Sequence, residues 1–147
     1  MLSRYFSVQE FERSDTAKRL RIDNSLTHTA HKNLQYLVDN LLHPLRQSLM
    51  KPIVVTSGYR SPKLNAAVRG SATSQHMRGE AADIKVVGLS SEQLATFIVN
   101  SGLPFDQLVW YDVQRGGHVH IALSKPKEDQ RLLHAPASGG YVRWSIK

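Results

Sequence analysis

The sequence predicts an α+β fold in which a small, mainly antiparallel sheet is flanked by helices. The first indication is the segment Thr29–Leu49, where apolar residues recur at helical spacing. Two short apolar runs, 53–57 and 81–87, have the length and composition of buried strands. Two further strand-like runs, 105–112 and 118–123, are joined by the turn sequence VQRGG, which is typical of an antiparallel hairpin with a loop.

Capping signals place the helices along the chain. Ser7 and Glu10 fit a capping box, which predicts a short helix within an otherwise irregular N-terminal arm. Pro44 lies inside the long helical segment and is expected to kink or divide it, because the proline ring cannot continue the hydrogen-bond ladder. Two more helices are expected at 61–70 and 90–102, each with a serine cap at its start and a glycine at its end.

The chain length of 147 residues favours a single domain spanning 1–147. We expect an N-terminal arm at 1–28, a core at 29–123 and a C-terminal tail at 124–147, in which the sequence GGYVRWSIK is suited to an edge strand. The hydrophobic content of 41% is typical of a globular protein. The chain has no cysteine, so any transition metal must be held by histidine and carboxylate side chains.

The chain is basic, with a formal net charge of +7 at pH 7. Such a surface favours an anionic partner, for example nucleic acid, a membrane surface or a cell-wall polymer. The basic residues are dispersed and form no stripe along a helix of the kind that DNA-binding proteins use, so we expect no nucleic-acid partner. We also expect no membrane partner and a monomer. The N-terminal sequence MLSRYFSVQEFERS has no apolar run of signal-peptide length, and no segment is long enough to span a membrane. We therefore expect a soluble protein that is cytoplasmic as synthesised.

Four polar residues in two segments form a candidate metal site. His76 lies in the loop sequence SQHMRGE, and Asp83 lies near the start of the next strand. His118 and His120 flank a valine, and residues at i and i+2 on a strand point to the same face. Gly79 gives the loop the freedom to bring His76 towards Asp83. A catalytic zinc takes three such ligands, so a zinc site is one interpretation, and ordinary packed or surface side chains are the other.

The ordered motifs SGYRSPKLN, SQHMRGEAADI and HVH resemble the signature of the zinc D-alanyl-D-alanine carboxypeptidases and their relatives, which include bacterial D,D-dipeptidases, phage endolysins and the Hedgehog signalling domain. The pattern S-x-H-x-x-G-x-A-x-D is matched at Ser74, His76, Gly79, Ala81 and Asp83. The resemblance spans residues 50–123, and the opening FSVQEFERS is similar to the arm of phage and prophage members. It implies a Hedgehog/DD-peptidase-like fold and a zinc metallopeptidase.

The resemblance also implies a role for each matching residue. The zinc ligands fall on His76, Asp83 and His120, because the family uses the second histidine of the pair. Arg60 matches an arginine that faces the scissile carbonyl or the substrate carboxylate, and a guanidinium suits this task because it stays charged and can bond two oxygens. Ser74 matches a serine that lines the substrate pocket. Zinc at such a site lowers the pKa of water and polarises the carbonyl.

The resemblance leaves the proton carrier open. Many relatives have a glutamate or aspartate three residues before the last histidine, where this chain has Gly117. Other relatives have a histidine two residues before it, and His118 matches them, so we expect His118 to carry the proton or stabilise the oxyanion. Asp112 is the runner-up, since it could reach the site across the hairpin. Glu80 falls on the other face by strand alternation and is expected to be exposed.

Other polar and aromatic residues have structural interpretations. Asp106 and Gln107 could orient a ligand histidine or simply occupy polar positions on a half-buried strand. Four histidines outside the motifs have no partners in their sequence context and are expected to be ordinary surface residues: His28, His31, His43 and His134. Three aromatic residues could wall a cleft but are more typical of a core: Tyr59, Trp110 and Tyr111.

These observations favour a zinc-dependent hydrolase that cuts D-amino-acid-containing peptide bonds of bacterial peptidoglycan, either as a D,D-carboxypeptidase or as an endopeptidase. A phage endolysin fits this description, and it would act on the cell wall after release by another factor. The alternative is a non-catalytic cell-wall-binding or phage structural module that retains the metal site, which Gly117 supports. A third hypothesis, a basic nucleic-acid-binding domain, predicts salt-sensitive DNA binding that chelators do not affect.

Overall fold

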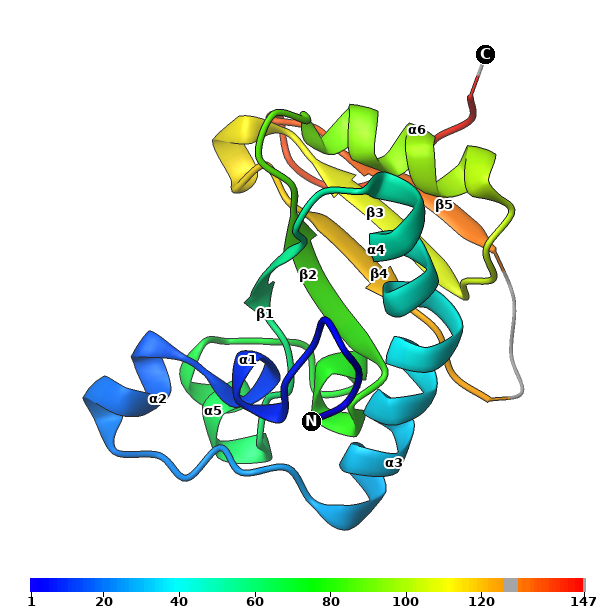
Figure 1. The fold of residues 1–147 in the computed structure, drawn as a ribbon. Helices are drawn as coiled ribbons and strands as arrows, with labels where there is room; N and C mark the ends of the chain where they lie inside the picture. Colours follow the sequence, from blue (N-terminus) through cyan, green and yellow to red (C-terminus); the bar gives the residue numbers. More distant parts are fainter. Residues whose placement is uncertain (126–129, 147) are drawn as a thin grey trace.

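A six-stranded sheet with the strand order β1-β2-β4-β3-β5-β6 forms the centre of the protein in the computed structural model, which describes residues 1–125 and 130–146 (Figure 1). The strands are β1 (Val54–Ser57), β2 (Ala81–Lys85), β3 (Gln107–Tyr111), β4 (Val119–Ala122), β5 (Arg131–Ala135) and β6 (Val142–Arg143). Neighbouring strands are antiparallel except β3 and β5, which are parallel. Together with the flanking helices, this sheet confirms the predicted α+β class.

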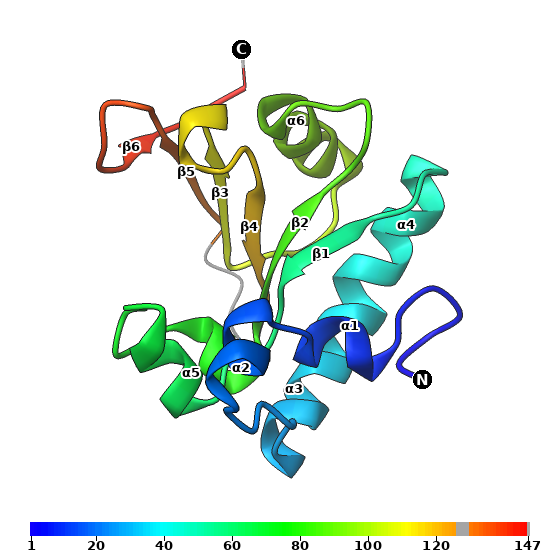
Figure 2. The same ribbon diagram turned by 90° about the vertical axis from the view of Figure 1, so that its left-hand side faces the viewer.

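A long helical segment packs against one face of the sheet (Figures 1 and 2). It consists of α3 (His28–Leu37), a π-helical turn η1 (Val38–Leu42) and α4 (His43–Leu49). Pro44 lies in the first turn of α4. Proline has no N–H for the helical ladder, and the π turn directly before it widens the helix where this hydrogen bond is lost. The backbone stays helical at Leu42 and His43, so the disturbance expected at Pro44 takes the form of a π turn within a continuous helix.

The N-terminal arm is more regular than the sequence indicates. Helix α1 (Val8–Glu12) begins at the predicted capping box, and its Phe11 is fully buried. A second helix, α2 (Asp15–Leu20), follows it, so the prediction of an irregular segment is wrong here. The Ser14 hydroxyl caps α2 by accepting from a backbone N–H. Ala17 is the one buried residue of α2, which explains why the sequence shows no apolar periodicity in this segment.

The other helices lie close to the expected positions. Helix α5 (Pro62–Ala67) follows the Ser61 cap, and α6 (Ser91–Ser101) ends at Gly102 in the left-handed conformation. A short 3₁₀ turn, η2 (Gln75–Arg78), occupies part of the expected polar loop. Within residues 1–125 and 130–146, no helix combines the length and hydropathy that a membrane span requires.

The C-terminal residues extend the sheet rather than forming a separate tail. Strands β3 and β4 make the expected antiparallel hairpin, with a 3₁₀ turn η3 (Val113–Arg115) in the connection. Strand β6 is the edge strand that the sequence predicts. Strand β5 is not predicted, because its sequence RLLHA contains no β-branched residue. Residues 126–129 and 147 of the expected tail lie outside the described part of the chain.

The two faces of the sheet have different surroundings. One face packs against the long helical segment and α6 through buried apolar residues, among them Ile84, Leu108, Val119 and Ile121 of the sheet and Leu34, Leu41, Leu45, Leu94 and Ile98 of the helices. On the opposite face, the register places Asp83, His120, Val109 and Leu133 side by side on four neighbouring strands. Side chains alternate along a strand, so this row points away from the helical layer.

Candidate metal centre

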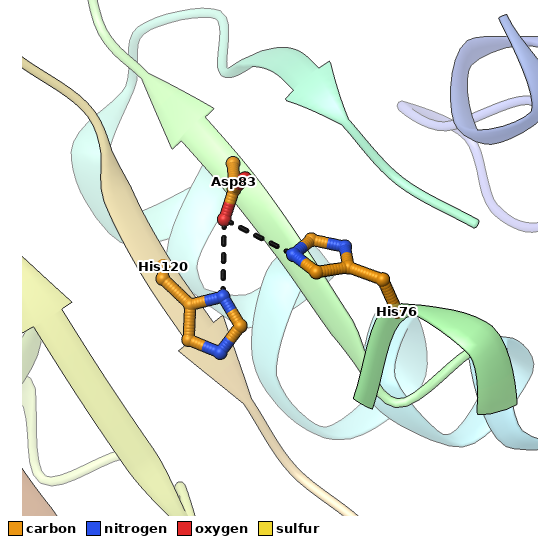
Figure 3. A group of neighbouring side chains, drawn as sticks. All are labelled: His76, Asp83 and His120. Atoms are coloured by element: carbon orange, nitrogen blue, oxygen red, sulfur yellow. Dashed lines mark hydrogen bonds and ion pairs between the residues drawn. The ribbon is translucent and has the colours of Figure 1, made fainter. Parts of the chain in front are cut away.

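Three side chains from separate segments converge on the face of the sheet opposite the long helical segment (Figure 3). His76 comes from η2, Asp83 from β2 and His120 from β4. Asp83 Oδ1 lies 3.0 Å from His120 Nδ1 and 3.3 Å from His76 Nε2. Each residue offers one ligand atom, and these atoms lie within 4.8 Å of one another. The structure thus brings together the three residues that match the zinc ligands of the resembled family.

The backbone around Gly79 places His76 over the sheet. Gly79 ends η2 with φ +73°, and a Cβ at this position would collide with the carbonyl oxygen of Ala30 in α3. Glycine is therefore required both for the left-handed turn and for the close approach of α3. From the other side, the Arg60 N–H donates to the His76 carbonyl over 3.1 Å. These contacts fix the loop that carries the first histidine.

The imidazoles of His76 and His120 each have one nitrogen close to Asp83 and the other close to an uncharged oxygen. His76 Nδ1 lies 2.7 Å from the carbonyl oxygen of Gly58, which can only accept, so in a neutral ring Nδ1 carries the proton and Nε2 has the lone pair. His120 Nε2 lies 3.2 Å from Gln75 Oε1. This pattern, in which the outer nitrogen of each ring is hydrogen-bonded to an oxygen, is the usual surrounding of metal-ligating histidines.

The buried nitrogen of His76 tests whether a metal fits this site. His76 Nε2 has no hydrogen-bond partner among the described residues, although it is buried and 3.3 Å from Asp83 Oδ1. A lone pair and a carboxylate oxygen repel at this distance unless a cation or a proton lies between them. Two imidazoles and one carboxylate are ligands that zinc accepts, so the donor set fits a zinc ion.

Asp83 supplies the negative charge of the cluster. Burial alone would raise the pKa of the Asp83 carboxyl, but the electrostatic influence of the adjacent His76 and His120 imidazoles outweighs burial and holds this pKa well below its usual range. Its second oxygen, Oδ2, faces two further cationic or titratable groups, Arg60 Nη2 at 3.9 Å and His118 Nε2 at 3.8 Å. The carboxylate therefore stays ionised and organises all four neighbours.

The cluster lies in a cleft of about 870 Å³. This volume suits a ligand of the size of a short peptide. Of the three aromatic residues expected in the core, Tyr59 and Trp110 are buried, whereas Tyr111 lines the cleft. Arg60 and Ser74 also line it.

His118 lies beside the cluster in the same cleft. Its half-buried ring stacks on Tyr111, with the ring centroids 4.3 Å apart. Burial lowers the pKa of the His118 imidazole, which favours the neutral form that can accept a proton. The two preceding glycines both have positive φ, and a Cβ on Gly116 would lie 2.9 Å from His118 Nδ1. Gly117, at the position of the acid in many relatives, has φ +65°.

Arg60 and Ser74 combine a position in the cleft with structural contacts. The Arg60 guanidinium donates to Ser57 Oγ and to Asn65 Oδ1, both over 3.4 Å. These two partners aim its remaining nitrogen, Nη2, at Asp83. The Ser74 hydroxyl accepts from the His76 N–H over 3.2 Å and so caps η2.

The structure does not bring Asp112 to the site. Asp112 Oδ1 lies 2.8 Å from His134 Nε2, and Oδ2 accepts from the Ala137 N–H over 2.7 Å. Tyr111, one residue earlier, faces the cleft, so alternation turns Asp112 to the other side. The expectation that Asp112 reaches across the hairpin to the site does not hold.

Three other acidic or amide residues differ from the expectations. Glu80 is half-buried in the cleft, where its carboxylate pairs with Arg78 Nε at 2.7 Å, so the prediction of an exposed Glu80 is wrong. Asp106 is buried and accepts from the Ser124 N–H and hydroxyl over 2.8 Å, and it has no hydrogen bond to either ligand histidine among the described residues. Gln107 lines the cleft without a hydrogen bond to a histidine among the described residues.

Two of the four histidines expected at the surface are exposed, namely His28 and His31. The other two, His43 and His134, are half-buried, so the surface prediction is wrong for them. The His134 ring stacks on Trp110 with 3.6 Å between the ring centroids. His134 lies on β5, where pairing with β3 places it next to Trp110, and the sequence carries no signal for this pairing.

Sequence reasoning missed the two groups that orient the ligand histidines, the Gln75 side chain and the Gly58 carbonyl. Metal-ligating histidines regularly donate their outer N–H to an oxygen, so a search for acceptors next to the motif would have included Gln75. A backbone carbonyl such as that of Gly58 leaves no sequence signal.

Two histidines and a carboxylate in a cleft, with an arginine and a third histidine beside them, define a site of the zinc metallopeptidase class. The Peptidase M15 family model matches residues 4–122, and the chain therefore belongs to this family. The match confirms the resemblance to the zinc D-alanyl-D-alanine carboxypeptidase-like peptidases. M15 peptidases are zinc-dependent, and membership supports a zinc peptidase that acts on peptidoglycan. A search of curated proteins found no match to the chain.

Proposed function

We propose that the protein hydrolyses D-amino-acid-containing peptide bonds of peptidoglycan, with zinc held by His76, Asp83 and His120. The observation that carries this proposal is the convergence of one nitrogen from each imidazole on the same carboxylate oxygen at the floor of the cleft. Zinc bound there supplies a Lewis acid, which acidifies water and polarises the scissile carbonyl.

His118 and Arg60 carry the remaining chemistry in this proposal. His118 Nε2 takes the proton of the attacking water and returns it to the leaving amine, and its lowered pKa keeps the imidazole neutral for the first step. The Arg60 guanidinium, on the Oδ2 side of Asp83, stabilises the developing oxyanion or holds a substrate carboxylate. The net charge of +7 suits an anionic cell-wall polymer.

A second candidate function is a wall-binding module that keeps the metal and lacks catalysis. Gly117 favours it, because no carboxylate stands where many relatives carry the general base. The two functions differ in whether His118 suffices as the proton carrier.

The test uses purified protein and peptidoglycan, with released amines and free D-alanine as separate readouts. Free D-alanine from a soluble pentapeptide stem identifies a D,D-carboxypeptidase, and amines released from cross-linked wall identify an endopeptidase of the endolysin type. We expect a chelator to abolish the activity and zinc to restore it. His118→Ala should retain zinc and lower kcat/KM by about 10²–10⁴-fold. Wall binding without release of either product from the wild type would reject the peptidase in favour of the binding module.

A further inference from the structure

We infer that Gln75 is a positioning residue that selects the nitrogen through which His120 binds the metal. This inference rests on the proposed metal site. Gln75 Oε1 lies 3.2 Å from His120 Nε2, on the side of the ring opposite the nitrogen that faces Asp83. The His120 side chain is 14% exposed, so solvent has limited access to replace this contact.

The chemistry of a neutral imidazole makes this contact decisive. The ring carries one proton, on either Nδ1 or Nε2. A proton on Nδ1 would be donated to Asp83 Oδ1 over 3.0 Å, and the ring could then offer no lone pair to a metal at that position. A proton on Nε2 is accepted by Gln75 Oε1, and Nδ1 is left free to bind the metal. Gln75 therefore stabilises the tautomer that the site requires.

The two ligand histidines differ in how their tautomers are fixed. The outer nitrogen of His76 meets the Gly58 carbonyl, a backbone group that accepts only. The outer nitrogen of His120 meets a side-chain amide, which can accept through its oxygen or donate through its nitrogen. A glutamate at position 75 would accept only, and a leucine would do neither. Substitution at Gln75 can therefore separate hydrogen bonding from packing.

One 3₁₀ turn, η2, both supplies a metal ligand and orients another. Gln75 and His76 are consecutive residues of η2, so the turn that supplies one ligand also orients a second ligand from β4. The backbone of Gln75 is itself held, because its carbonyl accepts from the Glu80 N–H over 3.1 Å. The Ser74 cap holds the start of the same turn. Gln75 thus has the fixed backbone that a positioning residue needs.

The test compares Gln75→Leu and Gln75→Glu with the wild type by zinc competition against a chromophoric chelator. We expect Gln75→Leu to weaken zinc binding by about 10–100-fold. Gln75→Glu should bind within about threefold of the wild type, because a carboxylate accepts the Nε2 proton. Gln107→Leu is the matched control, since Gln107 also lines the cleft but has no hydrogen bond to His120 among the described residues, and the zinc affinity of this variant should equal that of the wild type.

Long-range ¹H–¹⁵N spectra of the zinc-loaded protein provide a second readout. His120 should show a protonated Nε2 and a metal-bound Nδ1 in the wild type and in Gln75→Glu. Wild-type affinity in Gln75→Leu, or an equal loss in Gln75→Leu and Gln75→Glu, would overturn the inference, because neither result depends on an acceptor at position 75. A wild-type protein that binds no zinc would instead overturn the proposed metal site, and the inference with it.

Discussion

Two histidine–aspartate contacts lie on opposite faces of the same sheet, and they differ in what surrounds them. His120 and Asp83 approach to 3.0 Å on the cleft face, and His134 and Asp112 approach to 2.8 Å on the other. Both oxygens of Asp112 have one partner each, His134 and the Ala137 N–H. Asp83 Oδ1 instead faces two rings at once, and one of their nitrogens, His76 Nε2, is buried without a hydrogen bond among the described residues.

The comparison shows that a short histidine–aspartate distance does not define a metal site. The His134 ring is stacked on Trp110, so the contact between His134 and Asp112 helps to hold β5 against the end of β3. The Asp83 cluster has converging lone pairs and lies in a cleft that a ligand can enter. The two sites differ in whether several ligand atoms converge and whether a ligand can enter, and they differ little in the histidine–aspartate distance.

Matched substitutions at the two aspartates should give the largest contrast. Asp83→Asn removes the charge that offsets a bound cation, so we expect loss of zinc and of peptidoglycan hydrolysis. Asp112→Asn should retain zinc at the wild-type stoichiometry. Elemental analysis after dialysis measures both. Zinc retained by Asp83→Asn, or lost from Asp112→Asn in a folded protein, would contradict the distinction between the two pairs.

Gly79→Ala should destabilise the protein at the turn that carries His76. The left-handed conformation costs a non-glycine residue about 1–2 kcal/mol. The collision of the added Cβ with the Ala30 carbonyl adds to this cost, so we expect the free energy of unfolding to fall by more than about 2 kcal/mol. Gly102→Ala is the control, because Gly102 has φ +74° and no atom within 4 Å of the added Cβ. Equal losses in urea unfolding would show that the contact with α3 is unimportant.

His134→Ala should affect stability without affecting the metal. It removes the ring stacked on Trp110 and the hydrogen bond to Asp112, so we expect the free energy of unfolding to fall by about 1–2 kcal/mol. His28→Ala, at an exposed position, should change it by less than about 0.5 kcal/mol. Zinc affinity is measured on the same samples. A loss of zinc affinity in His134→Ala would show that the His134–Asp112 contact influences the metal site on the opposite face, and it would contradict the view that the two contacts are independent.

The smallest expected effect is a pH dependence at Asp112. The hydrogen bonds from His134 and from the Ala137 N–H lower the pKa of the Asp112 carboxyl below its unfolded value of about 3.9. Its stabilising contribution is therefore present above that value and is lost as the pH falls through the folded pKa. The difference in unfolding free energy between wild type and Asp112→Asn should narrow below about pH 4. A difference that stays constant from pH 7 to pH 3 in urea titrations would exclude this contribution.

Features that depend on near neighbours could be predicted from the sequence. The Ser7 and Ser90 caps act within three residues, and Pro44 acts on its own helix, so these elements were predicted close to their observed positions. The three converging side chains were selected by an ordered motif, with strand alternation accounting for the shared direction of His118 and His120.

Features that depend on distant partners could not be predicted. Strand β5 is held by parallel pairing with β3, and its own sequence carries no strand signal. Asp112 does not reach the site, because it follows Tyr111 directly and side chains alternate between the two faces of the sheet. Gln75 reaches His120 across 45 positions of the chain, and no spacing rule connects them.

The row of side chains across the sheet continues from Val109 to Leu133 on β5, which lies beyond residue 122, where the family match stops. Leu133, Arg131 and Tyr141 all line the cleft, so its outer floor is encoded separately from the segment that carries the three converging residues. Under the proposed function, substitutions after position 122 would reshape this part of the cleft while His76, Asp83 and His120 themselves stay unchanged. Under the proposed function, this part of the cleft gives the protein a means of changing its preference among peptides that is separate from the three converging residues.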